Sequence, residues 1–106
     1  MDNLYEQKAQ SLGIPPDVYI KILFDSIDYN RPVFAALESA IKQKDMVQIE
    51  RHSHFLKGSY SNLLLSSISE PMTELNKIAG EGDIAKIQSL FDRSLKAFME
   101  LSDSKE

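Results

Sequence analysis

The stretch ERHSHFLKGSYSNLLL, residues 50–65, decides the fold. Its apolar residues recur at intervals of three and four, which is the spacing of one face of an α-helix. With Leu56 as the reference and about 100° per residue, Ile49, Tyr60 and Leu63 fall within about 40° of it. The stretch therefore predicts a helix that buries one stripe of side chains and leaves the opposite face free.

The two histidines of the chain lie on different faces of that helix. His52 falls about 40° from Leu56, at the margin of the buried stripe, whereas His54 falls about 160° away and points at solvent. We expect His52 to be half-buried and to hydrogen-bond a neighbouring helix. Residues two apart on a helix do not face each other, and the chain has no cysteine. The sequence therefore predicts no metal site.

A glycine lies beside His54 on the exposed face. Gly58 is one turn further along, where a glycine costs about 1 kcal/mol relative to alanine. It does not face the core, and the apolar stripe that runs on to Leu63 argues against a helix end there. We infer that another molecule approaches the backbone beside His54. Lys57, also one turn from His54, is placed to offset negative charge on it.

Helical spacing extends through the rest of the chain, and no alternating run of β-branched residues predicts a strand. The helices are expected at residues 3–12, 17–43, 46–66, 70–79 and 84–102. Because the connections are short, we predict an all-α, up-and-down antiparallel four-helix bundle with a short N-terminal helical extension. The predicted core comprises Leu37, Ile41, Ile49, Leu56, Leu63, Leu75, Ile87, Leu90 and Phe98.

Single residues predict where several helices begin and end. Asp45 with Gln48 resembles a capping box, and Asp83 can cap the last helix. Ser69 is expected to begin the helix at residues 70–79, and Gly80 is expected to take the left-handed conformation directly after that helix.

In the helix expected at residues 17–43, a proline predicts where the helix bends, and the apolar spacing predicts which side is buried. Pro32 predicts a kink or break near residues 28–31. The buried stripe is expected to begin with Val18, Ile22, Phe24 or Asp25, and Ile27.

Length and composition narrow the class of protein. The 106 residues, 42% of them hydrophobic, suit one soluble globular domain. We expect it to span residues 1–106, with an N-terminal extension at 1–14 and a frayed tail at 103–106. A net charge of -4 argues against a nucleic-acid partner. No apolar run approaches the ~20 residues that span a membrane, and no signal peptide is recognisable, so a cytoplasmic protein is expected.

The chemistry open to His54 is nucleophilic. An exposed imidazole is mostly neutral at cytoplasmic pH and can attack a phosphoryl group without a general base. The chain has no glycine-rich phosphate loop and no carboxylate cluster near His54 to hold magnesium. We therefore predict no cofactor, and a partner that brings the metal and the rest of the active site.

The segment HFLKGS, residues 54–59, closely resembles the H-x-L-K-G-[SA] signature of histidine-containing phosphotransfer (HPt) domains. The flanking AALESAIKQKD and GEGDIAKIQSLFDRSLKAF resemble the helices around that signature. Such domains are four-helix bundles that relay phosphoryl groups. The resemblance implies that His54 is the phosphoacceptor and that Lys57 stabilises the phosphoryl group. It makes Leu56 and Ser59 structural.

The resemblance also implies the partners, which are a response-regulator receiver domain, a histidine kinase, or both. We expect Gly58, Arg51, Phe55 and Ser61 to contact them. The chain would then be a phosphoryl carrier and not an enzyme, and we expect a monomer.

Two positions depart from the family pattern. Leu64 stands where members commonly have glycine or another small residue, and Tyr60 stands where a small residue is frequent. Both bear on how the helix of His54 packs and ends, and so on the partner surface.

Two other functions stay open. The chain could be a non-phosphorylated helical adaptor that binds a signalling partner through the same face, although it keeps His54, Lys57 and Gly58 together. It could also be the phosphoacceptor part of a larger kinase. We favour a stand-alone protein.

Overall fold

The computed structural model describes residues 3–104, with side chains from residue 5 onward. Within them the chain is all-helical and has no strand, so the all-α prediction is confirmed. Residues 1–2 of the predicted extension and 105–106 of the predicted tail lie outside the described part. The helices are α1 (Asn3–Leu12), α2 (Pro16–Lys42), α3 (Met46–Asn62), α4 (Ser66–Ile78), the short 3-10 helix η1 (Ala79–Glu81) and α5 (Ile84–Ser104).

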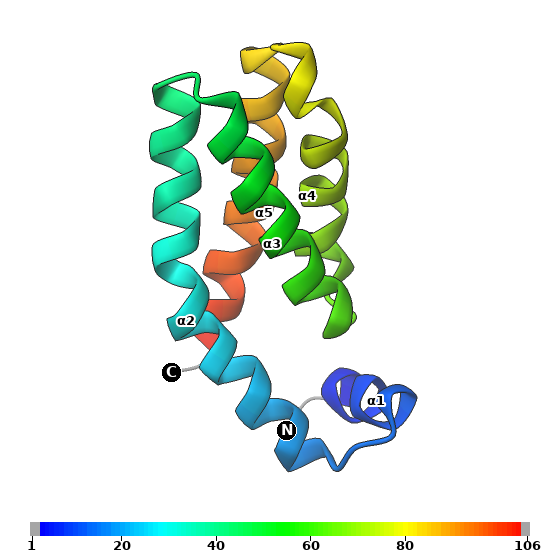
Figure 1. Cartoon of the computed structure of the whole chain (residues 1–106). Helices are drawn as coiled ribbons and strands as arrows, with labels where there is room; N and C mark the ends of the chain where they lie inside the picture. Colours follow the sequence, from blue (N-terminus) through cyan, green and yellow to red (C-terminus); the bar gives the residue numbers. More distant parts are fainter. Residues whose placement is uncertain (1–2, 105–106) are drawn as a thin grey trace.

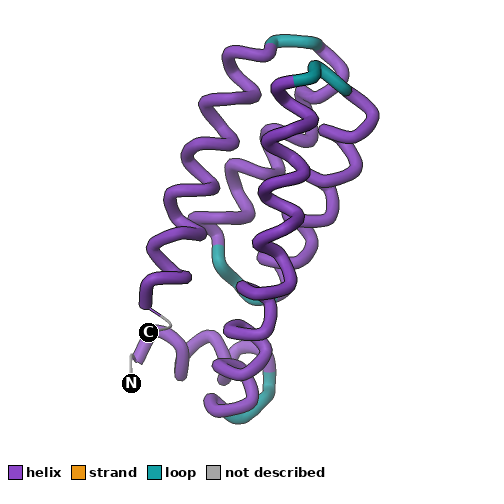
Figure 2. The backbone as a smooth tube through the Cα atoms, turned by 90° about the vertical axis from the view of Figure 1, so that its left-hand side faces the viewer, coloured by secondary structure: helices purple, strands orange, loops and turns teal. Residues whose placement is uncertain are grey.

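The long helices α2, α3, α4 and α5 pack lengthwise against one another (Figures 1 and 2). α3 packs against α2 and α4, while α5 packs against α4 and α2. α2 is the longest helix, and its first turns extend past the end of α3 to meet α1 (Figure 1). The result is an elongated molecule of 41 × 24 × 17 Å.

Apolar side chains from all four long helices fill the space between them. The ring of Phe34 on α2 lies 4.4 Å from Phe98 and 6.2 Å from Phe91, both on α5. Tyr60 of α3 packs edge-on against Phe98 at 6.1 Å. The predicted core is confirmed, because every one of its members is buried: Leu37, Ile41, Ile49, Leu56, Leu63, Leu75, Ile87, Leu90 and Phe98.

The start of α2 buries a different stripe from the predicted one. Val18 is 40% exposed and Ile22 is 45% exposed, so the prediction was wrong for both. Asp25 is exposed and Phe24 is half-buried, whereas Ile27 is buried as expected.

Tyr19 and Leu23 take the buried places instead. The Tyr19 hydroxyl donates a hydrogen bond to the Leu63 carbonyl oxygen at 2.7 Å, which allows a polar side chain to be buried there. The Tyr19 ring also lies 6.1 Å from that of Tyr5 on α1. Apolar spacing within α2 could not reveal this, because α1 and the end of α3 decide which side is covered.

Pro32 was predicted to kink or break the helix. α2 is continuous from Pro16 to Lys42, so Pro32 does not break it. Figure 1 shows the axis of α2 changing direction near its label. A proline removes one backbone hydrogen bond and bends a helix without ending it when packing holds both sides. Here Ile27 before the proline and Phe34 after it are both buried.

The junction of α3 and α4 also differs from the prediction. α3 ends at Asn62, and Leu64 adopts a left-handed conformation with φ of 60°. The Leu65 N–H donates to the Tyr60 carbonyl oxygen at 2.9 Å, and the Leu64 N–H donates to the Ser61 carbonyl oxygen at 3.0 Å. These two bonds form the Schellman motif that ends a helix.

The remaining predicted ends have mixed outcomes. α4 begins at Ser66, so Ser69 does not open it. Gly82, with φ of 76°, is the left-handed residue after η1, and Gly80 is not. The caps at Asp45 and Asp83 are confirmed, since each side chain accepts a backbone N–H three residues on.

Candidate functional site

α3 presents His54 on the side away from the core. His54 is exposed whereas Leu56 is fully buried, as the helical wheel predicted. Gly58 lies beside His54, and a Cβ added to it would meet no atom within 4 Å. Packing within the protein therefore does not require glycine there. We refer to His54, Lys57 and Gly58 together as the His54 face.

Lys57 is half-buried and Arg51 is exposed. Neither forms an ion pair or a hydrogen bond with the side chains that the structure describes. Both cations are therefore free to meet a negatively charged group at the His54 face.

An asparagine of α4 holds one side of α3. Asn76 Nδ2 donates to the Glu50 carbonyl oxygen at 3.0 Å and to Ser53 Oγ at 3.1 Å. Ser53 Oγ in turn donates to the Glu50 carbonyl oxygen at 3.2 Å. Glu50 lies about one turn before His54, and Ser53 directly precedes it.

An asparagine of α2 holds the other side. Asn30 Nδ2 donates to Ser59 Oγ at 3.0 Å. Sequence reasoning missed both Asn30 and Asn76. A signal existed for Asn30, which interrupts the apolar stripe between Ile27 and Phe34, but Asn76 gave none.

An aromatic pair flanks the His54 face on the α2 side. Phe55 is 42% exposed, and its ring lies 6.0 Å from that of Tyr29 on α2, which is 68% exposed. Together with Val33, Arg51 and His52, these rings line a hollow of about 280 Å³. Exposed aromatic side chains beside a reactive group are typical of protein-binding surfaces. The sequence had placed Phe55 and Arg51 on this surface but not Tyr29.

His52 is half-buried, as predicted, and forms part of that hollow. It makes no hydrogen bond with any residue from 5 to 104, so the predicted bond to a neighbouring helix was wrong. It lines that hollow together with the apolar side chains of Val33 and Phe55.

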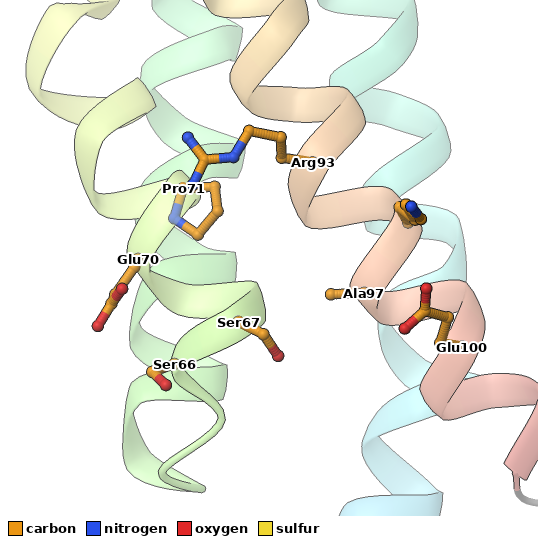
Figure 3. A pocket seen from close by; sticks show the side chains of 8 residues that line it. Ser66, Ser67, Glu70, Pro71, Arg93, Ala97 and Glu100 are labelled. Atoms are coloured by element: carbon orange, nitrogen blue, oxygen red, sulfur yellow. The ribbon is translucent and has the colours of Figure 1, made fainter.

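A second hollow, of about 300 Å³, lies between α4 and α5 (Figure 3). In Figure 3 Arg93 reaches from α5 toward Pro71, while Ser66 and Ser67 lie at the start of α4. The hollow contains two acidic and two basic side chains and no histidine. It is lined by Ser66, Ser67, Glu70, Pro71, Arg93, Lys96, Ala97 and Glu100.

Over residues 3–104, no three histidine, aspartate or glutamate side chains gather as a metal site would require. None of the helices in that range is long and apolar enough to cross a membrane.

The family model for the Hpt domain matches residues 22–104. The match takes in most of α2 and all of α3, α4 and α5, and it leaves α1 outside. Comparison with curated proteins and with solved structures gave no match. On the strength of a match over most of its length, the chain belongs to the Hpt domain family.

Proposed function

We propose that this protein is a histidine phosphotransfer protein of a two-component phosphorelay. It accepts a phosphoryl group on His54 and passes it to or from an aspartate of a response-regulator receiver domain. The observation that carries the proposal is the exposed imidazole of His54 beside the unpaired Lys57 and the open backbone at Gly58. Membership of the Hpt domain family supports phosphotransfer in two-component signalling.

In the proposed step a ring nitrogen of His54 attacks the phosphorus of a phosphoaspartate on the partner. The N–P bond forms as the P–O bond to the aspartate breaks, and the carboxylate leaves with the electron pair. The ring proton passes to solvent. The Lys57 ammonium offsets the charge brought by the phosphoryl group. The partner supplies the metal ion and the other charges, so this chain is a carrier and not an enzyme.

The proposed docking surface surrounds His54. Gly58 lets the partner approach the backbone closely, and Phe55 with Tyr29 offers exposed apolar area on one side. Arg51 and Ser61, both exposed, complete the surface. A receiver active site is acidic, so Arg51 and Lys57 attract it.

We further propose that the four long helices are the up-and-down bundle of one domain, with α1 as an extension of it. The protein would act as a monomer in the cytoplasm, where its partners present their receiver domains.

The test is a phosphotransfer profile. Each receiver domain of the same organism is phosphorylated with a small-molecule donor and mixed with the protein, and label on the protein is measured over time. At least one receiver should transfer its label within seconds to minutes. Binding of a receiver with no transfer from any of them would favour a non-phosphorylated adaptor.

A further inference from the structure

Asn30 is a polar side chain in the middle of the apolar face of α2. It is 1% exposed and lies between the buried Ile27 and Phe34. Its Nδ2 donates to Ser59 Oγ, whereas its Oδ1 is buried without a hydrogen-bond partner in the protein. Buried amide groups are nearly always satisfied, because an unpaired one loses water and gains nothing. A leucine would fill a similar volume without that loss.

The partner of Asn30 lies close to the His54 face. Ser59 follows Gly58 directly, and it lies five residues after His54, about 140° away around α3. A contact that holds Ser59 against α2 therefore turns His54 outward. Hydrogen bonds are directional, whereas the surrounding apolar contacts tolerate small rotations and shifts. A single buried asparagine is known to set the register of packed helices in this way.

The hydroxyls of Tyr19 and Tyr60 also join α2 and α3. The Tyr19 hydroxyl donates to the Leu63 carbonyl oxygen at 2.7 Å, and the Tyr60 hydroxyl donates to the Ser26 carbonyl oxygen at 3.4 Å. Both act on α3 further from His54 than Ser59 does. Burial raises the pKa of Tyr60, and hydrogen bonding to Ser26 and Asn30 offsets part of the rise.

We propose that Asn30 is a positioning residue for phosphotransfer. Through Ser59 it sets the rotation of α3 at which the His54 face meets the receiver domain, and the protein retains the unsatisfied amide oxygen for that reason. The inference rests on the proposed function, and it adds a residue that touches neither the phosphoryl group nor the partner.

The test replaces Asn30 by leucine in the full chain. Three quantities are measured: the melting temperature, the transfer rate from the receiver that exchanges fastest with the wild type, and the phosphorylation rate of His54 by phosphoramidate. Phosphoramidate is small and needs no docking. Asn30→Leu should keep or raise the melting temperature and leave the phosphoramidate rate unchanged. Transfer from the receiver should slow by about tenfold, since a misplacement of about 1 Å can cost about 10²-fold.

Ser94→Ala is the matched control. Ser94 is also buried, and its Oγ donates to the Ile68 carbonyl oxygen at 2.8 Å, between α5 and α4 and away from α3. This variant should lower the melting temperature and transfer phosphate at the wild-type rate.

Ser59→Ala removes the same hydrogen bond from the side of α3, and it carries the test if Asn30→Leu does not fold. The double variant should be no slower than Asn30→Leu, because both changes delete one contact. For Asn30→Leu, slower receiver transfer with an unchanged phosphoramidate rate and no fall in melting temperature supports the inference. Ser59→Ala leaves the Asn30 amide unpaired and should lower the melting temperature, so its supporting result is slower receiver transfer with an unchanged phosphoramidate rate. Receiver transfer at the wild-type rate, or a phosphoramidate rate that falls as much as receiver transfer does, overturns the inference. Wild-type protein that phosphoramidate and every receiver leave unlabelled would instead overturn the proposed function itself.

Discussion

Lys57 is a cation one turn from His54 with no ion-pair partner among residues 5–104. Lys57 is half-buried but has no ion pair among those residues to lose, so Lys57→Ala should change the free energy of unfolding by only about 0–1 kcal/mol. It should slow transfer or shorten the life of phosphorylated His54 about tenfold, if ~1.4 kcal/mol of charge stabilisation is lost. Lys21→Ala is the control, because Lys21 pairs with Asp25 on the exposed side of α2. Unchanged transfer and half-life together with weaker receiver binding would count against this role.

Two substitutions at Gly58 separate its proposed role in docking from its effect on folding. An alanine Cβ would meet no atom within 4 Å, so Gly58→Ala should stabilise the protein by about 1 kcal/mol through helix propensity. Gly58→Gln should also fold, but its side chain should keep the receiver away from His54 and slow transfer. Chemical denaturation and the transfer assay measure the two effects. A glutamine variant that transfers at the wild-type rate would refute the clearance argument.

The sequence correctly predicted the orientation of side chains that depends only on their position around α3. The outward His54 and the inward Leu56 follow from their angle around one helix. The roles of Asn30 and Asn76 do not, because each depends on an atom of another helix. His52 shows the same limit. Its half-burial could be predicted from α3 alone, whereas its lack of a hydrogen bond to a neighbouring helix among residues 5–104 could not.

Among the helix ends, the end of α3 contains a strained residue, Leu64, two positions after the last helical residue. Its φ of 60° is a left-handed conformation, which costs a residue with a Cβ about 1–2 kcal/mol. Leu64→Gly should remove that strain. Part of the gain is offset because glycine loses more chain entropy on folding, so the free energy of unfolding should rise by up to about 1 kcal/mol. The hydrogen bond from Lys8 Nζ to the Leu64 carbonyl oxygen, 2.8 Å, does not involve the side chain.

The control for this change is Leu65→Gly. Leu65 has φ of -100° and is buried, so glycine should destabilise the protein at that position. Melting temperatures of the two variants make the comparison. A lower melting temperature for Leu64→Gly than for the wild type would show that Leu64 is not strained.

The left-handed Leu64 also explains why two helix ends were misplaced. Leucine carries no signal for that conformation, so the predicted helix ran on to residue 66 and the next began too late. The family resemblance did single out position 64, and the structure supplies the reason why a small residue suits it. Likewise, the exposed Val18 and Ile22 could not be told from core residues by spacing alone.

On the scale of the whole molecule, the junction of α1, α2 and α3 should make stability depend on pH. Burial and the neighbouring Tyr5 raise the pKa of Tyr19 to about 12 from its ordinary value of 10.0. The neutral phenol is thus favoured in the folded state. Its stabilising contribution is complete below pH 10 and is lost as the pH rises through about 12.

Urea unfolding between pH 9 and pH 12 measures this loss. The wild type should lose stability over that range, and Tyr19→Phe should lose less, because Tyr60 alone then contributes a raised pKa. If the free energy of unfolding depends on pH equally in both proteins, the Tyr19 phenol does not contribute to that dependence.

The sequence predicted the shared core of the long helices better than it predicted the contacts made by α1. The nine core residues follow from helical spacing, because burial between several helices selects the same stripes that the pattern shows. The contacts of α1 with Tyr19 and with the end of α3 join segments that are distant in sequence, and no local pattern encodes them.

The identity of the phosphorylated residue is the central claim, and one comparison tests it directly. Wild type, His54→Gln and His52→Gln are each incubated with the labelled receiver that exchanges fastest with the wild type, and label on the chain is measured. We predict wild-type labelling of the His52 variant and no labelling of the His54 variant, since His54 is exposed on α3 whereas His52 is half-buried. Label retained by the His54 variant and lost from the His52 variant would contradict the assignment.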